Sequence, residues 1–428
     1  MCSLLTLFVS SVFAEEDAKV GQGKSLNEFV TPDGRIDLEA VRQSGYQGAL
    51  DLKDVDFSID PITGEPMVQN APVSNSAADL DDIYWDNSIS PSISGTNGSV
   101  YAVTIYGTNL IVGGSFTIAG GVLANNIAAW NGVSWSALGT GLGRVYALTV
   151  YDNKLIAGGD FTSAGGVYAN YVAAWDGSGW SALGTGVDFY VYALTVFNNQ
   201  LIVGGIFTEA GGVPANRIAA WDGSNWSTLA TGMSASVYAL TVYDGKLIAG
   251  GGFVTAGGVD VLFIAAWDGV NWSPLGTGMG GFVYALAEYN GQLIAGGIFG
   301  VAGGVTAFRI ASWNGSTWSA FGAGMNTPVY ALTVYNNQLI AGGIFTTAGS
   351  VSASKIATWD GSAWSALGTG MNNSVLAMTV YNSQLIAGGQ FTSAGGVTAK
   401  YIASWSGSSW SPLETAMDLS VSALTVYN

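Results

Sequence analysis

An all-β fold, in which one small antiparallel sheet is repeated along the chain, is predicted by three features of this 428-residue sequence. Segments similar to VYALTVY recur at a spacing of 45 residues once and 46 residues six times. Short runs rich in β-branched and aromatic residues fill each repeat, and no run has the 3.6-residue period of a helix. The recurring segments begin at Val100, Val145, Val191, Val237, Val283, Val329, Val375 and Val421.

Each repeat predicts four strands, which residues 329–374 illustrate. Only Asn336 and Asn337 separate the first two strands, so these form a tight hairpin. The four strands are 329–335, 338–343, 356–359 and 364–367. One such sheet cannot bury both faces, whereas sheets packed radially around an axis cover one another. The sequence therefore predicts a β-propeller with seven complete blades and a possible incomplete eighth; a solenoid is the alternative, although solenoid repeats are usually shorter or helical.

Paired tryptophans support the sheet. Each complete repeat has two, five positions apart, as at Trp130 and Trp135. They should face each other across the last two strands, where a cross-strand aromatic pair contributes about 0.2–1 kcal/mol relative to alanine. Of the 15 tryptophans, only Trp85 lies outside this pattern. The others are predicted to form core rather than a stacking site for a sugar or base.

Three regions are expected along the chain: a signal peptide at 1–14, an acidic linker or cap at 15–81 and the propeller at 82–428. Residues Leu4–Ala14 form an apolar run that ends in Val-Phe-Ala before acidic residues, which is typical of a cleaved secretion signal. The run is too short to span a bilayer, and an apolar amino-terminal strand is the alternative reading. Secretion or a cell-surface location is therefore expected.

Within the propeller, the complete repeats are predicted at 100–144, 145–190, 191–236, 237–282, 283–328, 329–374 and 375–420. Partial repeats are predicted at 82–99 and 421–428. These partial repeats either close the ring together as an incomplete eighth blade or reflect a truncated reading frame.

Composition excludes several kinds of chemistry. The chain has no histidine, and its one cysteine, Cys2, lies in the expected signal peptide. A Ser-His-Asp or Cys-His catalytic group, a histidine or thiolate metal site, and a disulfide in the mature chain are therefore ruled out. No cofactor or metal is expected. The net charge of −17 without a lysine or arginine cluster argues against nucleic acid or an anionic membrane as partner.

The repeats resemble kelch-type propellers, a superfamily that includes the central domain of galactose oxidase. The resemblance rests on the doubled glycine that ends the second strand, as at Gly113-Gly114, and on the tryptophan that opens the fourth, as at Trp135. The pattern GGxFTxAGG, IAAWDG, WSALGTG is more similar still to fungal cortical polarity-marker propellers and to related bacterial secreted repeat proteins. The resemblance covers 100–428. It implies an interaction platform, since the copper oxidase chemistry needs histidine and cysteine.

Sequence variation among the repeats points to one face. The turns between strands one and two, and between strands three and four, hardly vary, whereas the loops between strands two and three and between blades do. Because alternate turns of a meander lie at one end, both variable sets should emerge on the same rim. One position before each third strand reads Asn126, Tyr171, Arg217, Phe263, Arg309, Lys355 and Tyr401. The candidate binding residues are Tyr171, Asp188, Phe189, Tyr190, Glu209, Arg217, Asp260, Phe263, Phe282, Arg309, Lys355, Tyr401 and Asp418.

A non-enzymatic scaffold that binds protein or glycan through this rim is the predicted function. Neutral drift at exposed loops would also explain the variation. A carbohydrate-active hydrolase that uses Asp188 and Glu209, and a structural envelope component, are the alternatives. Glu288 in a first strand is expected at a solvated strand end. The recurring turn aspartate, as at Asp176, resembles the sialidase Asp-box, where it is structural, and is interpreted as turn chemistry.

Overall fold

A computed structural model describes residues 55–59, 66–70 and 95–413. The chain divides into two compact units, Met1–Asp86 and Asn87–Asn428. In the first unit, β1 (Val55–Ile59) pairs antiparallel with β2 (Pro66–Asn70). Within the described residues there is no helix, and hence none long and apolar enough to cross a membrane. The predicted signal peptide, Trp85 and the partial repeat 421–428 lie outside the described residues.

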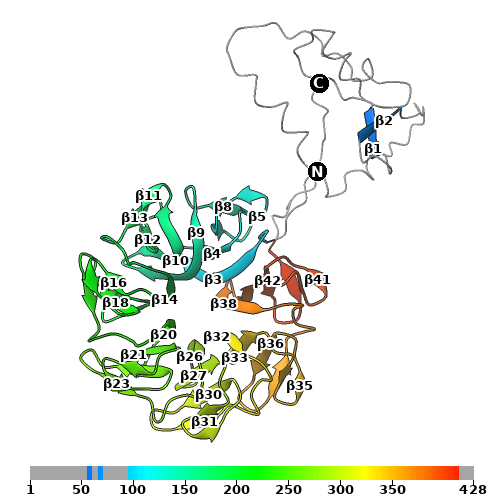
Figure 1. The fold of residues 1–428 in the computed structure, drawn as a ribbon. Coiled ribbons are helices and arrows are strands. Elements are labelled where there is room, and N and C mark those ends of the chain that lie inside the picture. The colour runs from blue at the N-terminus through cyan, green and yellow to red at the C-terminus, as the bar shows by residue number, and fades with distance from the viewer. Residues whose placement is uncertain (1–54, 60–65, 71–94, 414–428) are drawn as a thin grey trace. The chain divides into compact units, whose positions relative to one another are not determined.

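The second unit is a β-propeller of seven four-stranded antiparallel blades, which confirms the predicted fold class (Figure 1). The first strand of each blade lies nearest the centre of the ring. These strands are β3 (Ser99–Tyr106), β9 (Leu142–Tyr151), β14 (Val191–Phe197), β20 (Val237–Tyr243), β26 (Val283–Tyr289), β32 (Val329–Tyr335) and β38 (Val375–Tyr381). The second strands are β4 (Asn109–Ser115), β10 (Lys154–Ala164), β15 (Gln200–Gly205), β21 (Lys246–Gly251), β27 (Gln292–Gly297), β33 (Gln338–Gly343) and β39 (Gln384–Gly389).

The two outer strands of each blade are short. The third strands are β7 (Ile127–Trp130), β12 (Val172–Trp175), β18 (Ile218–Trp221), β24 (Ile264–Trp267), β30 (Ile310–Trp313), β36 (Ile356–Trp359) and β42 (Ile402–Trp405). The fourth strands are β8 (Trp135–Ala137), β13 (Trp180–Ala182), β19 (Trp226–Thr228), β25 (Trp272–Pro274), β31 (Trp318–Ala320), β37 (Trp364–Ala366) and β43 (Trp410–Pro412). Short outer strands leave little unpaired edge exposed.

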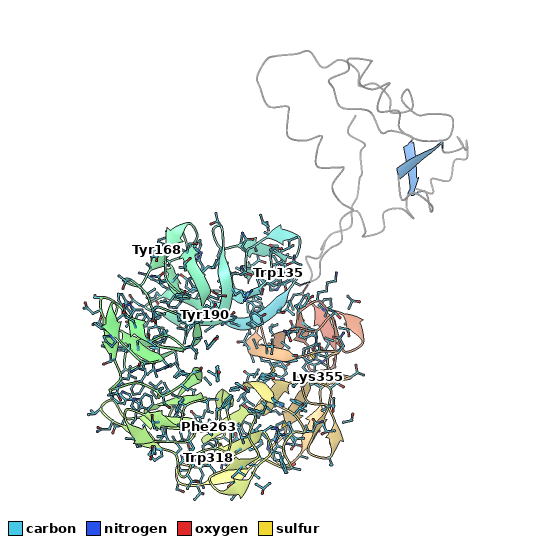
Figure 2. All side chains as sticks on the ribbon, viewed as in Figure 1. Trp135, Tyr168, Tyr190, Phe263, Trp318 and Lys355 are labelled. Carbon is cyan, nitrogen blue, oxygen red and sulfur yellow. The ribbon has the colours of Figure 1, made fainter. Side chains whose placement is uncertain are left out.

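The tryptophan pairs occupy the predicted cross-strand positions. Trp221 on β18 faces Trp226 on β19, and the two ring centroids are 5.3 Å apart. The other six pairs have the same register, with centroids 5.2–5.4 Å apart. In Figure 2, Trp135 and Trp318 lie toward the periphery of the ring, whereas Tyr190 lies beside its centre. The tryptophans therefore build the outer part of each blade, as predicted.

Side-chain hydrogen bonds from tryptophan and tyrosine join neighbouring blades and also close the ring. The indole N–H of Trp226 donates to the carbonyl oxygen of Leu183 in the preceding blade at 2.9 Å. Trp135 in the first blade donates in the same way to Leu413 in the seventh at 3.5 Å. Likewise, the Tyr381 hydroxyl of the seventh blade donates to Thr108 of the first at 3.0 Å. The seventh blade thus contacts the first directly, and seven blades complete the ring.

The core lies between blades. Seven clusters of buried side chains each combine residues of two neighbouring blades. One of them joins Ile156 and Leu183 of the second blade to Val191, Leu201 and Phe207 of the third. Since each blade buries its faces against its neighbours, the ring forms a single rigid support for its loops.

The turns that join the third and fourth strands are held by a side-chain oxygen, which in four blades belongs to a carboxylate. Asp176 accepts hydrogen bonds from the backbone N–H groups of Ser178 at 2.8 Å and Gly179 at 2.9 Å. These bonds, with one from the Ser178 hydroxyl, lower the pKa of Asp176 to about 2. Asn131 and Asn314 accept equivalent bonds in their own blades. The recurring aspartate is therefore turn chemistry.

We expect the stability of the propeller to fall as the pH drops from about 4 to about 2. The pKa values of Asp176, Asp222, Asp268 and Asp360 are lowered in the folded chain by backbone N–H groups, so the unfolded chain binds protons first. A variant with all four aspartates changed to asparagine should keep the turns and lose this part of the pH dependence. Urea unfolding of both proteins between pH 2 and pH 5 measures it, and equal slopes would contradict the assignment.

Candidate binding face

The loops between blades and the loops between strands two and three meet on one face, as the variation in sequence predicts. Val187, between two blades, forms an isolated bridge with Ala210, in the loop that follows β15. Equivalent bridges join Met233 to Ala256 and Met279 to Ala302. We call this face the loop rim. The two variable loop sets therefore support each other in every blade.

Each loop between strands two and three contains a hairpin that the sequence analysis left as loop. Separate hairpins in the first, third, fourth, fifth and sixth blades pair β5 (Ile118–Ala119) with β6 (Val122–Leu123), β16 (Glu209–Ala210) with β17 (Val213–Pro214), β22 (Thr255–Ala256) with β23 (Val259–Asp260), β28 (Val301–Ala302) with β29 (Val305–Thr306), and β34 (Thr347–Ala348) with β35 (Val351–Ser352). In the seventh blade β40 (Ser393–Ala394) pairs with β41 (Val397–Thr398), and in the second β10 itself continues to pair with β11 (Val167–Tyr168). The feature of the sequence that could have predicted these hairpins is the Gly-Gly pair in the loop. Gly211 and Gly212, for example, have φ values of +64° and +81°, which suit a two-residue hairpin turn.

Asp188 and Glu209 are neighbours on this rim, but the Asp188 carboxylate holds the loop. Its Oδ1 accepts the backbone N–H groups of Thr208 at 2.7 Å and Glu209 at 2.9 Å, and its Oδ2 accepts the Thr208 hydroxyl at 2.7 Å. Burial raises the pKa of Asp188, but these hydrogen bonds outweigh it and the net pKa is lowered. Asn326 and Asn372 cap the same loop in other blades. A carboxylate with a lowered pKa and both oxygens engaged is poorly suited to donate a proton.

The position before each third strand has one backbone conformation but carries five different kinds of side chain. All seven residues have φ between +62° and +69°. The backbone around them is fixed by two hydrogen bonds: the N–H of Arg217 donates to Phe207 at 2.8 Å, and its carbonyl accepts the N–H of Gly205 at 2.9 Å. We call the set the display ring; its members are Asn126, Tyr171, Arg217, Phe263, Arg309, Lys355 and Tyr401. A positive φ is unfavourable for all of them except asparagine.

We expect Lys355→Asn to raise the free energy of unfolding by about 0.5–1 kcal/mol, because asparagine tolerates a positive φ better than lysine does. Asn126 shows how an asparagine fits this position: its side chain accepts the N–H of Phe116 at 2.9 Å and donates to the carbonyl oxygen of Leu142 at 2.8 Å. Lys355→Ala is the control, because alanine gains neither advantage. Thermal unfolding compares the three proteins, and a loss of stability in the asparagine variant would contradict the strain.

Several predicted residues come together where the second and third blades meet. The Phe189 and Tyr190 rings stack with centroids 4.2 Å apart, and Tyr171 lies 5.8 Å from Tyr190. Between the fourth and fifth blades, Phe263 lies 5.7 Å from Phe282, which is 40% exposed. Glu209 and Asp260 are exposed on their own hairpins, and Asp418 lies outside the described residues. Five of the six predicted aromatic residues thus form two groups, and Tyr401 belongs to neither.

The sequence analysis missed a set of tyrosines at the centre of this face. We call it the tyrosine collar. The collar residues are Tyr101, Tyr146, Tyr192, Tyr238, Tyr284 and Tyr330, with Leu376 in the seventh blade. Neighbouring rings around the circle have centroids 5.4–5.7 Å apart. Tyr190 and Phe282 contact the collar, at 6.4 Å from Tyr146 and 6.3 Å from Tyr284 respectively. The two aromatic groups of the rim therefore continue into the centre of the ring.

A bulge in each first strand explains why alternation in VYALTVY did not reveal the collar. Val191 pairs with Gly205 and Ala193 pairs with Gly204, so Tyr192 is an extra residue without a partner. The first strands of the other six blades have the same register shift. Bulges often re-aim a side chain next to a binding or active site. Here they place Tyr192, Tyr238, Tyr284 and Tyr330 against a cavity of about 220 Å³ that the first strands of all seven blades line.

An ion pair also escaped the sequence analysis. Arg144, at the position that Tyr190 occupies in the next blade, has its Nη1 atom 3.6 Å from Asp160 Oδ2. Burial raises the pKa of Tyr146 beside this pair, and the Arg144 guanidinium partly opposes that rise. In the part of the chain that the structure describes, no three His, Cys, Asp or Glu side chains gather where they could hold a metal ion. The face combines aromatic rings, hydroxyl groups and few free charges.

Comparison with known proteins gives limited likenesses. A family model described as a β-propeller domain of unknown function (DUF5122) matches residues 152–173. Among solved structures, the computationally designed Ika8 protein has a TM-score of 0.47 and 16% identity, and the match covers 76% of this chain and 98% of that one. The WD40 propeller domain of Doa1 has a TM-score of 0.47 and 14% identity, with 69% and 92% covered. No curated protein matches the chain.

Proposed function

We propose that the chain is a non-enzymatic binding scaffold that recognises a protein or glycan partner with its loop rim. The display ring carries this proposal, because one rigid backbone position holds seven side chains that are aromatic, cationic or amide. Backbone strain of this kind clusters at ligand clamps and other functional sites. Tyr171, Phe263 and Tyr401 also pack in part against the cores between blades, which holds their rings in place. Variable side chains on a rigid support are the usual arrangement of binding loops.

The cellular setting belongs to the same proposal. A cleaved signal at 1–14 would deliver the propeller outside the cytoplasm, where glycans and surface proteins are available. The resemblance to kelch-type and fungal polarity-marker propellers supports an interaction role. Secretion can be tested by expressing the full chain with a carboxy-terminal tag and sequencing the amino terminus of the product. Cleavage after Ala14 is expected, and an intact cytoplasmic product would contradict it.

A sixfold asparagine variant tests the display ring while keeping a residue that suits its backbone conformation. It changes Tyr171, Arg217, Phe263, Arg309, Lys355 and Tyr401 to the residue that the first blade already has at Asn126. Wild type and variant are titrated against immobilised polysaccharides and extracellular proteins. The control variant Asp152→Asn, Asp244→Asn alters turns between first and second strands, at the opposite ends of β9 and β20 from the loop rim.

The expected result is that the asparagine variant loses at least tenfold in affinity for the partner while the control keeps it. Circular dichroism and thermal unfolding must show that both variants remain folded. Equal affinity of wild type and asparagine variant, loss of affinity in the control alone, or no binding of the wild type to any member of the panel would contradict the proposal.

A further inference from the structure

The tyrosine collar has free hydrogen-bonding capacity. At the other end of the first strands, Tyr151 and Tyr243 donate their hydroxyl groups to backbone carbonyls of the next blade, at 3.2 and 3.0 Å. In the collar, by contrast, five hydroxyl groups make no hydrogen bond within residues 95–413; Tyr146 has Arg144 beside it. Each collar ring is half-buried. The collar therefore offers phenol groups, which donate and accept, beside aromatic faces.

The cavity that the collar surrounds is small and uncharged. Its volume of about 220 Å³ is below the ~300–1,000 Å³ typical of sites for drug-sized ligands. None of the described residues that line it carries a charge; Tyr192, Tyr238, Tyr284, Tyr330 and Leu376 lie among alanines and aliphatic side chains. One ring-sized group fits such a space, whereas a whole oligomer does not.

The charges near the cavity and the hydroxyl groups of the collar limit the chemical class of ligand that can bind there. A cation would be attracted to the electron-rich faces of the tyrosines, but no carboxylate of the described residues lines the cavity to pair with it, and Asp160, the carboxylate that acts on Tyr146 and Tyr192, is already paired with Arg144. An anion would meet no cationic lining residue, and residues 100–428 carry 13 acidic against 7 basic residues. A purely apolar group would leave the hydroxyl groups without partners, which is costly on desolvation. A neutral ring with an apolar face and hydroxyl groups at its edge satisfies all three conditions.

We infer that the tyrosine collar binds one neutral pyranose ring, either a free monosaccharide or the end unit of a glycan chain. The C–H face of the sugar stacks on tyrosine rings, whose faces are electron-rich, and the sugar hydroxyl groups exchange hydrogen bonds with the phenol groups. Leu376 stands in place of a tyrosine, so the side of the collar at the seventh blade offers the sugar no aromatic face and no hydroxyl group. This inference rests on the proposed scaffold function and names the ligand at the centre of its binding face.

The test compares two collar variants with a matched control. Tyr238, Tyr284 and Tyr330 are changed together to leucine, which Leu376 shows to be compatible with this position. A second variant changes the same three residues to phenylalanine, which keeps the rings and removes the hydroxyl groups. The control, Tyr243→Phe with Tyr335→Phe, removes hydroxyl groups at the opposite ends of β20 and β32.

Calorimetric titration uses the full chain and defined probes: methyl pyranosides of glucose, galactose, mannose and N-acetylglucosamine, the matching tetrasaccharides, putrescine and adenosine. We expect wild type to bind at least one pyranoside, the leucine variant to bind it at least tenfold more weakly, the phenylalanine variant to lie between them, and the control to match wild type. Tighter binding of the tetrasaccharide than of the monosaccharide would identify a glycan end as the ligand, and equal affinity a free sugar.

Three results would overturn the inference: no pyranoside binding by wild type, unchanged pyranoside binding in both collar variants, or binding of putrescine or adenosine in place of the sugars. Its failure can be told apart from failure of the scaffold proposal. If the asparagine variant of the display ring still loses its partner, the rim is the binding face and only the sugar assignment to the collar is wrong.

Discussion

Phe207→Ala is expected to lower the free energy of unfolding by about 3–5 kcal/mol, the usual cost of removing a buried phenylalanine side chain. Phe207 is 0% exposed and lies in the cluster that joins the second and third blades. Its backbone carbonyl also accepts the N–H of Arg217, so the side chain anchors a member of the display ring. Urea unfolding measures the loss, with Phe207→Leu as a milder control.

Every blade has a buried phenylalanine at the position of Phe207. The equivalent residues are Phe116, Phe161, Phe253, Phe299, Phe345 and Phe391, and each is 5% exposed or less. Partner binding should weaken together with stability, because removing the Phe207 ring leaves the loop that carries Arg217 without its buried support. A loss of less than 1 kcal/mol would mean that the phenylalanine does not hold the rim.

Gly204→Ala is expected to destabilise the propeller by about 1–3 kcal/mol, because overpacking a filled interface is costly. A Cβ atom there would lie 2.6 Å from Val237 Cγ1 and 3.2 Å from Leu240 Cδ1, both in the next blade. The first glycine of each doubled pair therefore lets neighbouring blades approach, while a Cβ on the second, Gly205, would meet the carbonyl oxygen of Tyr190.

Gly179→Ala is the matched control for this effect. A Cβ atom at Gly179 would meet nothing within 4 Å, and Ala363 occupies the equivalent turn position in the sixth blade. Its free energy of unfolding should stay within about 0.5 kcal/mol of wild type. Thermal and urea unfolding of both variants provide the comparison. Equal stability of the two variants would show that the blade interface has room to spare.

The number of blades, the strand order and the tryptophan pairs could be predicted because they depend on local patterns. A two-residue gap such as Asn336-Asn337 fixes a hairpin, and the two residues have φ values of +49° and +58°. A repeat of 46 residues fixes which strands share a sheet. The position of both variable loop sets on one face followed from the alternation of turns, and the bridge between Val187 and Ala210 agrees with it.

The tyrosine collar and the positive φ values of the display ring could not be predicted from those patterns. Tyr192 sits in a run that alternates like an ordinary strand, and only its pairing with the second strand reveals the bulge. Arg217 resembles any loop residue in sequence, because its positive φ is imposed by hydrogen bonds to Phe207 and Gly205. Asp188 is the reverse case, since residue type alone left a chemical role open, whereas the structure shows its carboxylate accepting the backbone N–H groups of a neighbouring loop.

Hydrogen–deuterium exchange in the presence of the sugar and partner probes tests most directly the claim that the loop rim is the binding face. The account predicts added protection at the rim ends of β14, β20 and β26, around Tyr192, Tyr238 and Tyr284, and in the adjoining loops. The turns at the opposite ends of these strands, such as Asn198-Asn199, should exchange as before. Protection at those turns or along the outer strands, or no protection with any probe, would contradict it.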